Sequence, residues 1–350
     1  MPLSQIDSQY LSELRDSTQL TLRAAIGDAS DVAILDAPNQ TNVGDSLIWA
    51  GELAYLRRMG LRLRYVADIK TFDAGRLRRV MPRGVVLLHG GGNFGDLWVG
   101  HQMHREKVVR ELPDYRIVQL PQSVYFKSKE RAETANSILG QHPDFHLLLR
   151  DPLSLERAAE LLPALSTEFC YDMALGYQPP EPPHPPRPKS ILIIAREDRE
   201  AASGLSSVTQ DWIQGAEITS TDWHSEGWLA TKYRLARACM HLQRTLARAN
   251  RKLRVTPVLP QVIERSLIKS LNQINIDGAL KWYASASIVV VDRLHAHVLA
   301  LLLGLDHVAL DNNYRKIGAV FDLYTGKFST ARYATDTDTA RHIVQTWVGR

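Results

Sequence analysis

The sequence predicts an α/β protein built from two Rossmann-like, doubly wound domains that face each other across a cleft. Three observations support this fold class: apolar strand-like runs alternate with helical patterns, the alternation restarts after a proline-rich stretch, and polar residues follow one strand after another. Such alternation is typical of parallel sheets covered on both faces, which bind ligands at the carboxyl ends of their strands. The 350 residues suffice for two hydrophobic cores.

The first half of the chain opens with a helix at residues 7–26, where apolar side chains recur at helical spacing. The strands predicted after it are residues 32–35, 63–66, 85–88, 116–120 and 145–149. The predicted helices are residues 47–59, 74–80, 101–112, 129–139 and 153–162. We expect Asp45 or Ser46 to cap the first of these helices, because both side chains accept hydrogen bonds from backbone N–H groups.

A proline-rich stretch divides the chain, with seven prolines between residues 177 and 189. Clustered prolines favour the polyproline II conformation, which joins neither sheet. We therefore expect one domain at residues 1–177, a linker at residues 178–189 and a second domain at residues 190–350. We leave open that the last helix packs back on the first domain.

The second half repeats the alternation of strands and helices. Its predicted strands are residues 190–195, 253–258, 288–291 and 307–310, and its predicted helices are residues 229–248, 261–271, 295–303 and 339–348. Between residues 200 and 227 lies a long polar stretch, and long loops in compact domains are usually functional. Trp212, Trp223 and Trp228, in or next to it, are expected either to stack on sugar rings or to anchor the loop to the core.

The composition limits the partners and the compartment. A net charge of +4 with dispersed arginines argues against nucleic acid. Two widely separated cysteines indicate a reducing compartment, and neither a signal peptide nor a membrane-spanning run is evident. We expect a cytoplasmic protein, and leave open whether its mildly basic surface meets the inner face of the plasma membrane. The sequence does not predict an oligomeric state.

The glycine-dense stretch at residues 89–96 invites two readings that the rest of the sequence does not support. Gly90, Gly92 and Gly95 have G-x-G-x-x-G spacing, but the next predicted strand does not end in the acidic residue that holds a dinucleotide ribose. The stretch also resembles the oxyanion loop of α/β-hydrolases, yet the chain has no G-x-S-x-G nucleophile motif. Its backbone N–H groups remain suited to a ligand.

No metal or organic cofactor is expected. His101 and His104 share one predicted helix, and His295 and His297 lie close together at another. Neither pair has a third carboxylate or thiolate ligand nearby in the sequence, as a protein metal site would need. A structural or non-metal role is favoured for both pairs.

Polar residues stand at the end of one predicted strand after another. They are residues 42–45, 89–96, 122–123, 150–151, 172, 196 and 292–295. Each alone would usually be a turn or a helix cap, but together they favour a ligand site in the cleft. Arg196 and Arg293 provide permanent positive charge for a phosphate or carboxylate. Asp45, Asp96 and His295 are candidates for proton transfer.

The same residues resemble a known family, the polysaccharide pyruvyltransferases. The resemblance spans about residues 40 to 320 and is carried by Asn42-Val43-Gly44-Asp45, His89-Gly90-Gly91-Gly92-Asn93-Phe94-Gly95-Asp96, Leu120-Pro121-Gln122-Ser123, Arg150-Asp151 with Ser154, Asp172 with Ala174, and Arg293-Leu294-His295-Ala296. It implies two domains arranged as in GT-B glycosyltransferases. It also implies phosphoenolpyruvate as donor, a sugar of a cell-surface polysaccharide or its lipid-linked precursor as acceptor, a pyruvate ketal as product, and release of phosphate.

The resemblance also implies roles for particular residues. Arg293, Leu294 and His295 match a motif that contributes to the phosphoenolpyruvate site, and Arg196 matches an arginine just after the first strand of the second domain. The remaining expected substrate-binding residues are Asn42, Gly44, Gly91, Gly92, Asn93, Gln122 and Ser123. One position departs from the family, since Tyr125 lies in the segment where members often place a histidine.

We assign the general acid to His295 and the general base to Asp96, with Asp45 as the next candidate for the base. Two other functions remain as alternatives on the same residues. The first is a nucleotide-sugar glycosyltransferase of the GT-B kind, because a diphosphate would suit the same cleft and arginines. The second is a non-catalytic sugar- or anion-binding protein.

Overall fold

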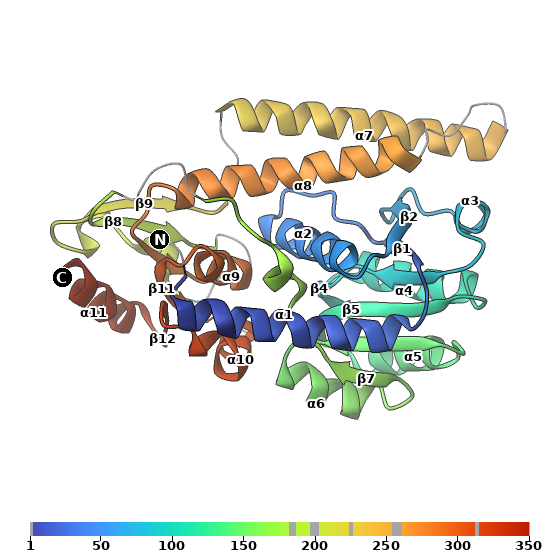
Figure 1. The fold of residues 1–350 in the computed structure, drawn as a ribbon, viewed down its shortest axis with the longest axis horizontal. Coiled ribbons are helices and arrows are strands. Elements are labelled where there is room, and N and C mark those ends of the chain that lie inside the picture. Colours follow the sequence, from blue (N-terminus) through green and yellow to red (C-terminus); the bar gives the residue numbers. More distant parts are fainter. Residues whose placement is uncertain are drawn as a thin grey trace.

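Two parallel β-sheets form the centre of the molecule in a computed structural model (Figure 1). The structure describes residues 3–181, 187–196, 203–223, 227–253, 261–311 and 315–349. The fold class is therefore the mixed α/β, two-sheet arrangement that the sequence predicts. Part of the expected linker, residues 182–186, and most of the expected strand at 253–258 lie outside the described residues, while Leu253 ends a helix.

The first sheet has seven strands in the order β2-β1-β3-β5-β6-β7, with β4 pairing to β5. They are β1 (Asp31–Leu35), β2 (Arg62–Ala67), β3 (Val85–Leu88), β4 (Gly91–Gly95), β5 (Arg116–Tyr125), β6 (Phe145–Leu149) and β7 (Ser166–Phe169). Every pairing is parallel. Crossover helices join parallel strands; here they are α2 (Val43–Arg58), α3 (Ala74–Val80), α4 (Val99–Glu111), α5 (Lys129–Gly140) and α6 (Pro152–Leu161).

The second sheet has five parallel strands in the order β12-β11-β10-β8-β9. They are β8 (Ser190–Ile194), β9 (Glu217–Thr221), β10 (Ile288–Val291), β11 (Asp306–Leu310) and β12 (Ala331–Ala334). The helices of this half are α7 (Gly227–Leu253), α8 (Gln261–Tyr283), α9 (Leu294–Leu302), α10 (Lys316–Leu323) and α11 (Thr337–Val348).

Both faces of each sheet are buried, as the alternation along β1 illustrates. Val32 and Ile34 pack into the core shared by the two sheets, whereas Ala33 and Leu35 pack against the opposite helices. A separate apolar cluster covers the outer face of the second sheet. The shared core holds the two halves together, and so the ends of the strands in both sheets keep a fixed relation to one another.

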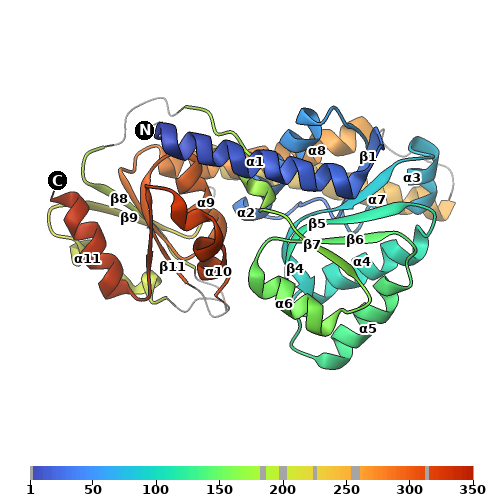
Figure 2. The ribbon, with the colours of Figure 1, turned by 60° about the horizontal axis from the view of Figure 1, so that its bottom comes forward.

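Some helices do not stay with the sheet nearest in sequence. The first helix, α1 (Gln5–Ile26), runs across both halves (Figure 2), and its Asp7 accepts hydrogen bonds from the Ser329 backbone at 2.9 Å. Helix α8 packs on α2 and β2 of the first half, with α7 outside it (Figure 1). The last helix, which we left open to return to the first domain, packs instead against β11 and β12.

Three features differ from the sequence-based expectation. The glycine-dense stretch contains strand β4, which was not predicted; its small residues can pair closely with β5. Elements β7, β9, β12 and α10 were not predicted, since they are short or lie in polar stretches. Helix α2 begins four residues earlier than expected and is capped by Asn42, not by Asp45 or Ser46, through a 2.9 Å hydrogen bond from the Gly44 N–H. In the described part of the chain, no helix is long and apolar enough to cross a membrane.

Candidate active site

A cavity of about 330 Å³ lies where loops from the two sheets meet. It is lined by Gln40, Thr41, Asn42, Val43, Gly44, Asp45, Gly92, Asn93, Trp98, His101, Arg150, Arg196, Asp222, Trp223, Arg293, Leu294 and His295. Segments that follow β1, β6, β8, β9 and β10 contribute to it, which is where doubly wound sheets bind ligands. Nine of the thirteen site residues predicted from sequence are in this lining.

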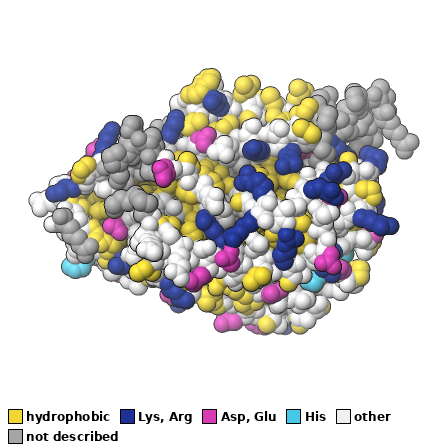
Figure 3. Space-filling view, in the orientation of Figure 1, with side chains coloured by type: hydrophobic (Ala, Val, Ile, Leu, Met, Phe, Trp, Pro, Cys, Tyr) yellow, Lys and Arg dark blue, Asp and Glu magenta, His cyan; other side chains and the backbone are white. Residues whose placement is uncertain are grey.

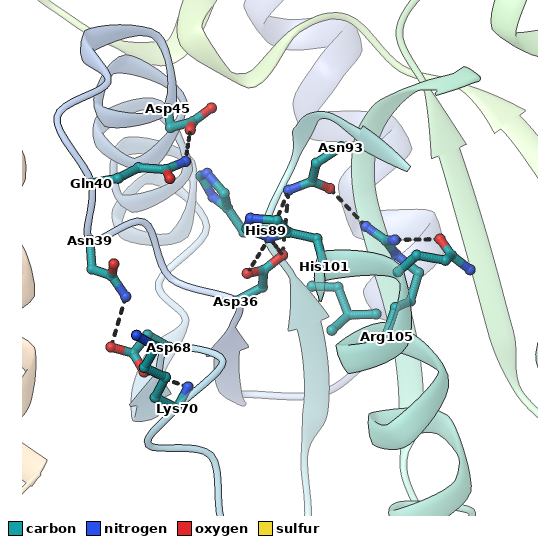
Figure 4. Close-up of polar contacts among 12 residues, drawn as sticks. Asp36, Asn39, Gln40, Asp45, Asp68, Lys70, His89, Asn93, His101 and Arg105 are labelled. Atoms are coloured by element: carbon teal, nitrogen blue, oxygen red, sulfur yellow. Dashed lines mark hydrogen bonds and ion pairs between the residues drawn. The ribbon is translucent and has the colours of Figure 1, made fainter. Parts of the chain in front are cut away.

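His101, in the first turn of α4, is held by a buried aspartate at the end of β1. Its Nδ1 lies 2.9 Å from both carboxylate oxygens of Asp36 (Figure 4). Burial opposes ionisation of Asp36, but the hydrogen bond and charge of His101 outweigh it and lower the pKa of the carboxyl group. With Nδ1–H donating to Asp36, Nε2 is the ring nitrogen left to accept a proton.

A buried polar network fixes the wall behind this pair. Arg105 donates to the Asn93 side-chain oxygen at 2.9 Å and to Gln119 at 2.6 Å (Figure 4 shows the Arg105–Asn93 contact). Gln122 accepts from the Asn93 N–H at 3.1 Å and donates to the His89 carbonyl at 2.9 Å. Gln122 therefore positions Asn93 from behind and does not itself line the cavity. Buried donors and acceptors that are all paired give a rigid wall.

His295, in the first turn of α9, belongs to the second half but meets residues of the first. Its Nε2 lies 3.4 Å from Arg150 Nη1 and 3.4 Å from Asp172 Oδ2. Arg150 and Asp172 are themselves paired at 2.6 Å and are almost completely buried. Burial opposes ionisation of Asp172, yet Arg150 and then His295 hold the pKa of this carboxyl group well below its usual range. His295 thus sits beside a permanent ion pair, at the junction of the halves.

Two glycines allow the close approach of the side chains in this junction. A Cβ on Gly44 would lie 2.6 Å from His295 Nδ1, and a Cβ on Gly92 would lie 3.2 Å from Arg150 Nη2. Any larger residue at position 44 would displace the His295 ring or the N-terminus of α2. The positive end of the α2 helix dipole lies at this N-terminus and suits an anion.

The second half supplies two more arginines. The Arg293 guanidinium pairs with Asp222, just after β9, at 2.5 Å. The backbone N–H of Arg196, after β8, donates to Asp292 at 2.8 Å. Burial raises the pKa of Asp292, although hydrogen bonds and the two arginines oppose the shift. Because Asp292 also accepts from Ser203 at 2.6 Å, it holds together the segments that carry both arginines.

Four predicted site residues lie outside the cavity lining. The Asp96 carboxylate, our expected base, accepts the N–H groups of Lys127 and Ser128 at 2.7 Å each, next to the start of α5. Ser123 donates to Asp151 at 2.7 Å. Gly91 and Gln122 belong to the paired strands β4 and β5. These four residues support the segments around the cavity from outside it. The structure gives no support for Asp96 as a base in the cavity.

Asp45, the second candidate for the base, does line the cavity. Its Oδ2 accepts hydrogen bonds from Gln40 and Asn42, each at 2.9 Å (the Gln40 contact is drawn in Figure 4). Both partners are neutral side-chain amides of the same loop and helix start. The geometry suits binding of hydroxyl groups better than proton abstraction.

A buried histidine–glutamate pair lies next to the glycine stretch. His89 Nδ1 is 2.9 Å from Glu52, whose other contact is the Gly90 N–H, also at 2.9 Å. Burial opposes protonation of His89, but the charge of Glu52 and the hydrogen bond to it overcome that effect and raise the pKa of His89 to about 8. The pair fixes the glycine stretch, and His89 Nε2 has no partner among the described residues.

The other histidines noted in the sequence are structural. His104 packs edge-on against Phe72, and burial lowers its pKa to about 4. His297 is hydrogen-bonded inside the core to the Thr325 hydroxyl (2.7 Å) and to the His307 ring (2.8 Å). Within the described ranges, no group of three His, Cys, Asp or Glu side chains is placed to hold a metal ion.

Sequence reasoning missed Asp36, His101 and Asp222 as site residues, and it gave Arg150 no individual role. Arg150 stood in a recognised motif, and its position after β6 was a usable signal. Asp36 also ends a predicted strand, but a single acid there commonly caps a turn. His101 follows no strand, so only its contact with Asp36 identifies it. The three tryptophans of the polar stretch have different surroundings. Trp223 lines the cavity, Trp212 packs on the core, and Trp228 is exposed.

Comparisons with known proteins agree with the residues in this cavity. The sequence pattern of the polysaccharide pyruvyl transferase family matches residues 42–314. A Bacillus subtilis protein provisionally named pyruvyl transferase EpsO is 30% identical over 287 residues, which cover 82% of this chain and 83% of that protein. Pyruvyl transferase 1 of Schizosaccharomyces pombe is 28% identical over 295 residues, covering 81% of this chain and 66% of its own length.

A similar fold is found in a solved structure. The crystal structure of a functionally uncharacterized protein from Klebsiella pneumoniae aligns with a TM-score of 0.58 over 92% of this chain and 98% of that chain. At 14% identity this similarity concerns the fold alone. The family match extends over most of the chain and includes every cavity-lining residue except Gln40 and Thr41. The chain therefore belongs to the polysaccharide pyruvyl transferase family and is a transferase.

Proposed function

We propose that this protein transfers the pyruvyl group of phosphoenolpyruvate to a sugar of a cell-surface polysaccharide or of its lipid-linked precursor. The product is a pyruvate ketal that bridges two sugar hydroxyls, and inorganic phosphate is released. One observation carries the proposal: Arg150, Arg196, Arg293, His101 and His295 converge on a single cavity between the two halves.

The charges of the cavity suit a small dianionic or trianionic donor. Three arginines line it, and two of them, Arg150 and Arg293, are oriented by the carboxylates of Asp172 and Asp222. Arg293 and Arg196 belong to segments joined by Asp292, which supports a role for both in binding one ligand. Guanidinium groups bind phosphate and carboxylate in forked geometry. Phosphoenolpyruvate has one of each group, and the N-terminus of α2 offers further N–H donors.

We assign the two proton transfers to the two histidines. His101 accepts the proton of the first sugar hydroxyl as its oxygen bonds to C2 of the donor, and His295 donates a proton to C3, which becomes the methyl group. The C2–O bond to phosphate then breaks, and the second hydroxyl bonds to C2 while His295 recovers a proton from it. The proton that His295 gave to the methyl carbon is thus replaced by the proton of the second hydroxyl. The proton of the first hydroxyl passes from His101 to the released phosphate.

We assign no step to a metal or organic cofactor. The arginines and helix N-termini serve the anionic groups, and Asp36 and Asp172 serve the two histidines. His101 takes the place of Asp96 as base, because Asp96 is bound to backbone N–H groups outside the cavity. The cavity arginines are preorganised positive charges that stabilise the negative charge on the leaving phosphate.

The test measures phosphate release and the mass of the acceptor. With phosphoenolpyruvate and a suitable oligosaccharide, release should require both compounds, and the acceptor should gain the mass of one pyruvate ketal. Arg293→Ala should reduce kcat/KM by about 10²- to 10³-fold, because it removes a charge-assisted hydrogen bond to the donor. Arg62→Ala is the matched control, since Arg62 also pairs with an aspartate (Asp31, 2.7 Å) but outside the cavity.

Binding experiments separate this proposal from the two alternatives. Phosphoenolpyruvate should raise the unfolding temperature, whereas nucleoside diphosphate sugars should not, because only a ligand of the native state stabilises it. The opposite pattern would replace the proposal with a nucleotide-sugar glycosyltransferase. Binding of phosphoenolpyruvate without any phosphate release in the presence of a panel of acceptors would indicate a non-catalytic anion-binding protein.

A further inference from the structure

Helix α7 (Gly227–Leu253) differs in charge from the rest of this nearly balanced chain. It contains no aspartate or glutamate in 27 residues. Its basic residues are Lys232, Arg234, Arg237, Arg244, Arg248, Arg251 and Lys252. It is also the outermost layer on its side of the molecule, above α8 and α2 (Figure 1). An all-basic surface helix is expected to meet an anionic partner.

Large apolar side chains project from the outer face of α7. Trp228, Leu235 and Leu242 are 68%, 67% and 61% exposed. Because they are spaced by seven residues, they lie along one side of the helix. Hydrophobic side chains follow the edge of the molecule where α7 runs, with Lys and Arg side chains beside them (Figure 3). Val262, at the start of α8, is a further exposed apolar residue.

The inner face of α7 is already occupied, and so the apolar stripe cannot turn inward. Arg244 bonds to the buried Asp68 through two nitrogens, at 2.5 and 3.1 Å. Tyr233 accepts a hydrogen bond from Thr41 at 3.0 Å, and Arg237 donates to the Asn39 carbonyl. These contacts tie α7 to the loop after β1, which also lines the cavity.

We infer that the outer face of α7 docks on an anionic lipid bilayer. An amphipathic helix with basic residues and exposed Trp and Leu is the kind that lies in a membrane interface. Trp228 suits the headgroup region, and the basic side chains can reach phosphates while their stems stay apolar. A second copy of the chain is a poorer partner, because two such helices would bring the exposed Lys232 and Arg234 of one against those of the other.

Docking would place the cavity close to the membrane surface. The helix that meets the lipid holds residues 39–41 through its inner face, and residues 40–45 line the cavity. An acceptor sugar carried on a lipid would then reach the cavity without leaving the bilayer. This consequence rests on the proposed function, whereas the docking itself does not, and binding and activity are therefore measured separately.

The first test is co-sedimentation of the full-length protein with vesicles of phosphatidylcholine alone or with an equal part of phosphatidylglycerol. Binding should require phosphatidylglycerol and weaken with salt. Leu235→Glu with Leu242→Glu should lower the partition coefficient at least about tenfold, since two apolar anchors are lost and two negative charges added. Leu20→Glu on α1 is the control, because Leu20 is 71% exposed but distant from α7 in sequence and layer.

The second test uses Cys239, which is exposed on α7, as a site for an environment-sensitive fluorophore. Cys170 is buried, and burial raises the pKa of its thiol, so labelling should be selective. The emission should shift to the blue with phosphatidylglycerol vesicles only. Phosphate release with a soluble acceptor should be unchanged in the double variant. Equal vesicle binding by wild type and double variant would overturn the inference, and so would a loss of self-association in the variant without any vesicle binding.

Discussion

His101 and His295 line the same cavity, yet they are held in different ways. His101 Nδ1 lies 2.9 Å from Asp36, and both residues belong to the first half. His295 Nε2 lies 3.4 Å from Asp172, across the junction of the halves, and Asp172 is already paired with Arg150 at 2.6 Å. The first histidine is oriented by its own domain, and the second depends on how the two domains meet.

This difference suggests separate tasks. A fixed tautomer, with Nδ1–H given to an aspartate, prepares His101 to accept a proton at Nε2. His295 lies between an arginine and an aspartate at the junction of the halves, where it would meet an anionic donor bound to the cavity arginines. The acceptor hydroxyl would meet a base, His101, that is already oriented. The bound donor would complete the surroundings of the acid, His295.

The largest effect is expected from His295→Asn, which removes the proposed acid. The kcat should fall by about 10³-fold, within the range of general acid–base catalysis. His146→Asn is the matched control, because His146 also bonds to an aspartate (Asp144, 2.8 Å) but outside the cavity. Steady-state phosphate release measures both variants. A kcat within twofold of wild type for His295→Asn would reassign the acid.

The next effect is expected from the His101–Asp36 pair. His101→Asn should lower kcat by about 10²-fold with little change in the KM for phosphoenolpyruvate, because the pair is proposed to serve the acceptor. Asp36→Asn should act in the same direction, because the aspartate no longer holds the tautomer that leaves Nε2 free to accept a proton. A higher KM for the donor with unchanged kcat would instead place His101 in the donor site.

Gly44→Ala tests the junction without removing a functional group. The added Cβ would lie 2.6 Å from His295 Nδ1, so the ring must move. We expect kcat to fall by roughly 30-fold, because small displacements of catalytic groups are costly. The control is Gly100→Ala, where the added Cβ meets nothing within 4 Å. A crystal structure of the Gly44 variant with an unmoved His295 and full activity would contradict the assigned role of this contact.

The contrast between the histidines also shows how far the sequence could lead. His295 was predictable because a polar residue after a buried strand and before a helix is a ligand position in doubly wound sheets. His101 was not, because it lies within a helix, and its partner Asp36 is 65 positions away. Contacts between segments so distant in sequence arise from the order of strands β1, β3 and β5, which composition and periodicity do not encode.

The fold was predictable where apolar runs were strong and uncertain where they were not. Strands β3, β6 and β10 have the predicted bounds, because short apolar runs at the centre of a sheet are buried on both faces. Edge strands such as β7 and β12 bury fewer side chains, so their apolar signal is weak. The placement of α7 and α8 over the first half follows from side-chain contacts such as Arg244–Asp68, which no local pattern indicates.

His89 is a third histidine paired with a carboxylate, but its pair with Glu52 is fully buried and lies outside the cavity. Titration of His89 should change the stability of the fold and not the pH dependence of the reaction. Its pKa is raised from 6.5 to about 8, so the stabilisation is fully present below pH 6.5 and is lost as the pH rises through 8. We expect the free energy of unfolding to fall by about 1 to 2 kcal/mol over that interval. Denaturant unfolding between pH 6 and about 9 measures this slope, which should be absent in His89→Asn and retained in His146→Asn.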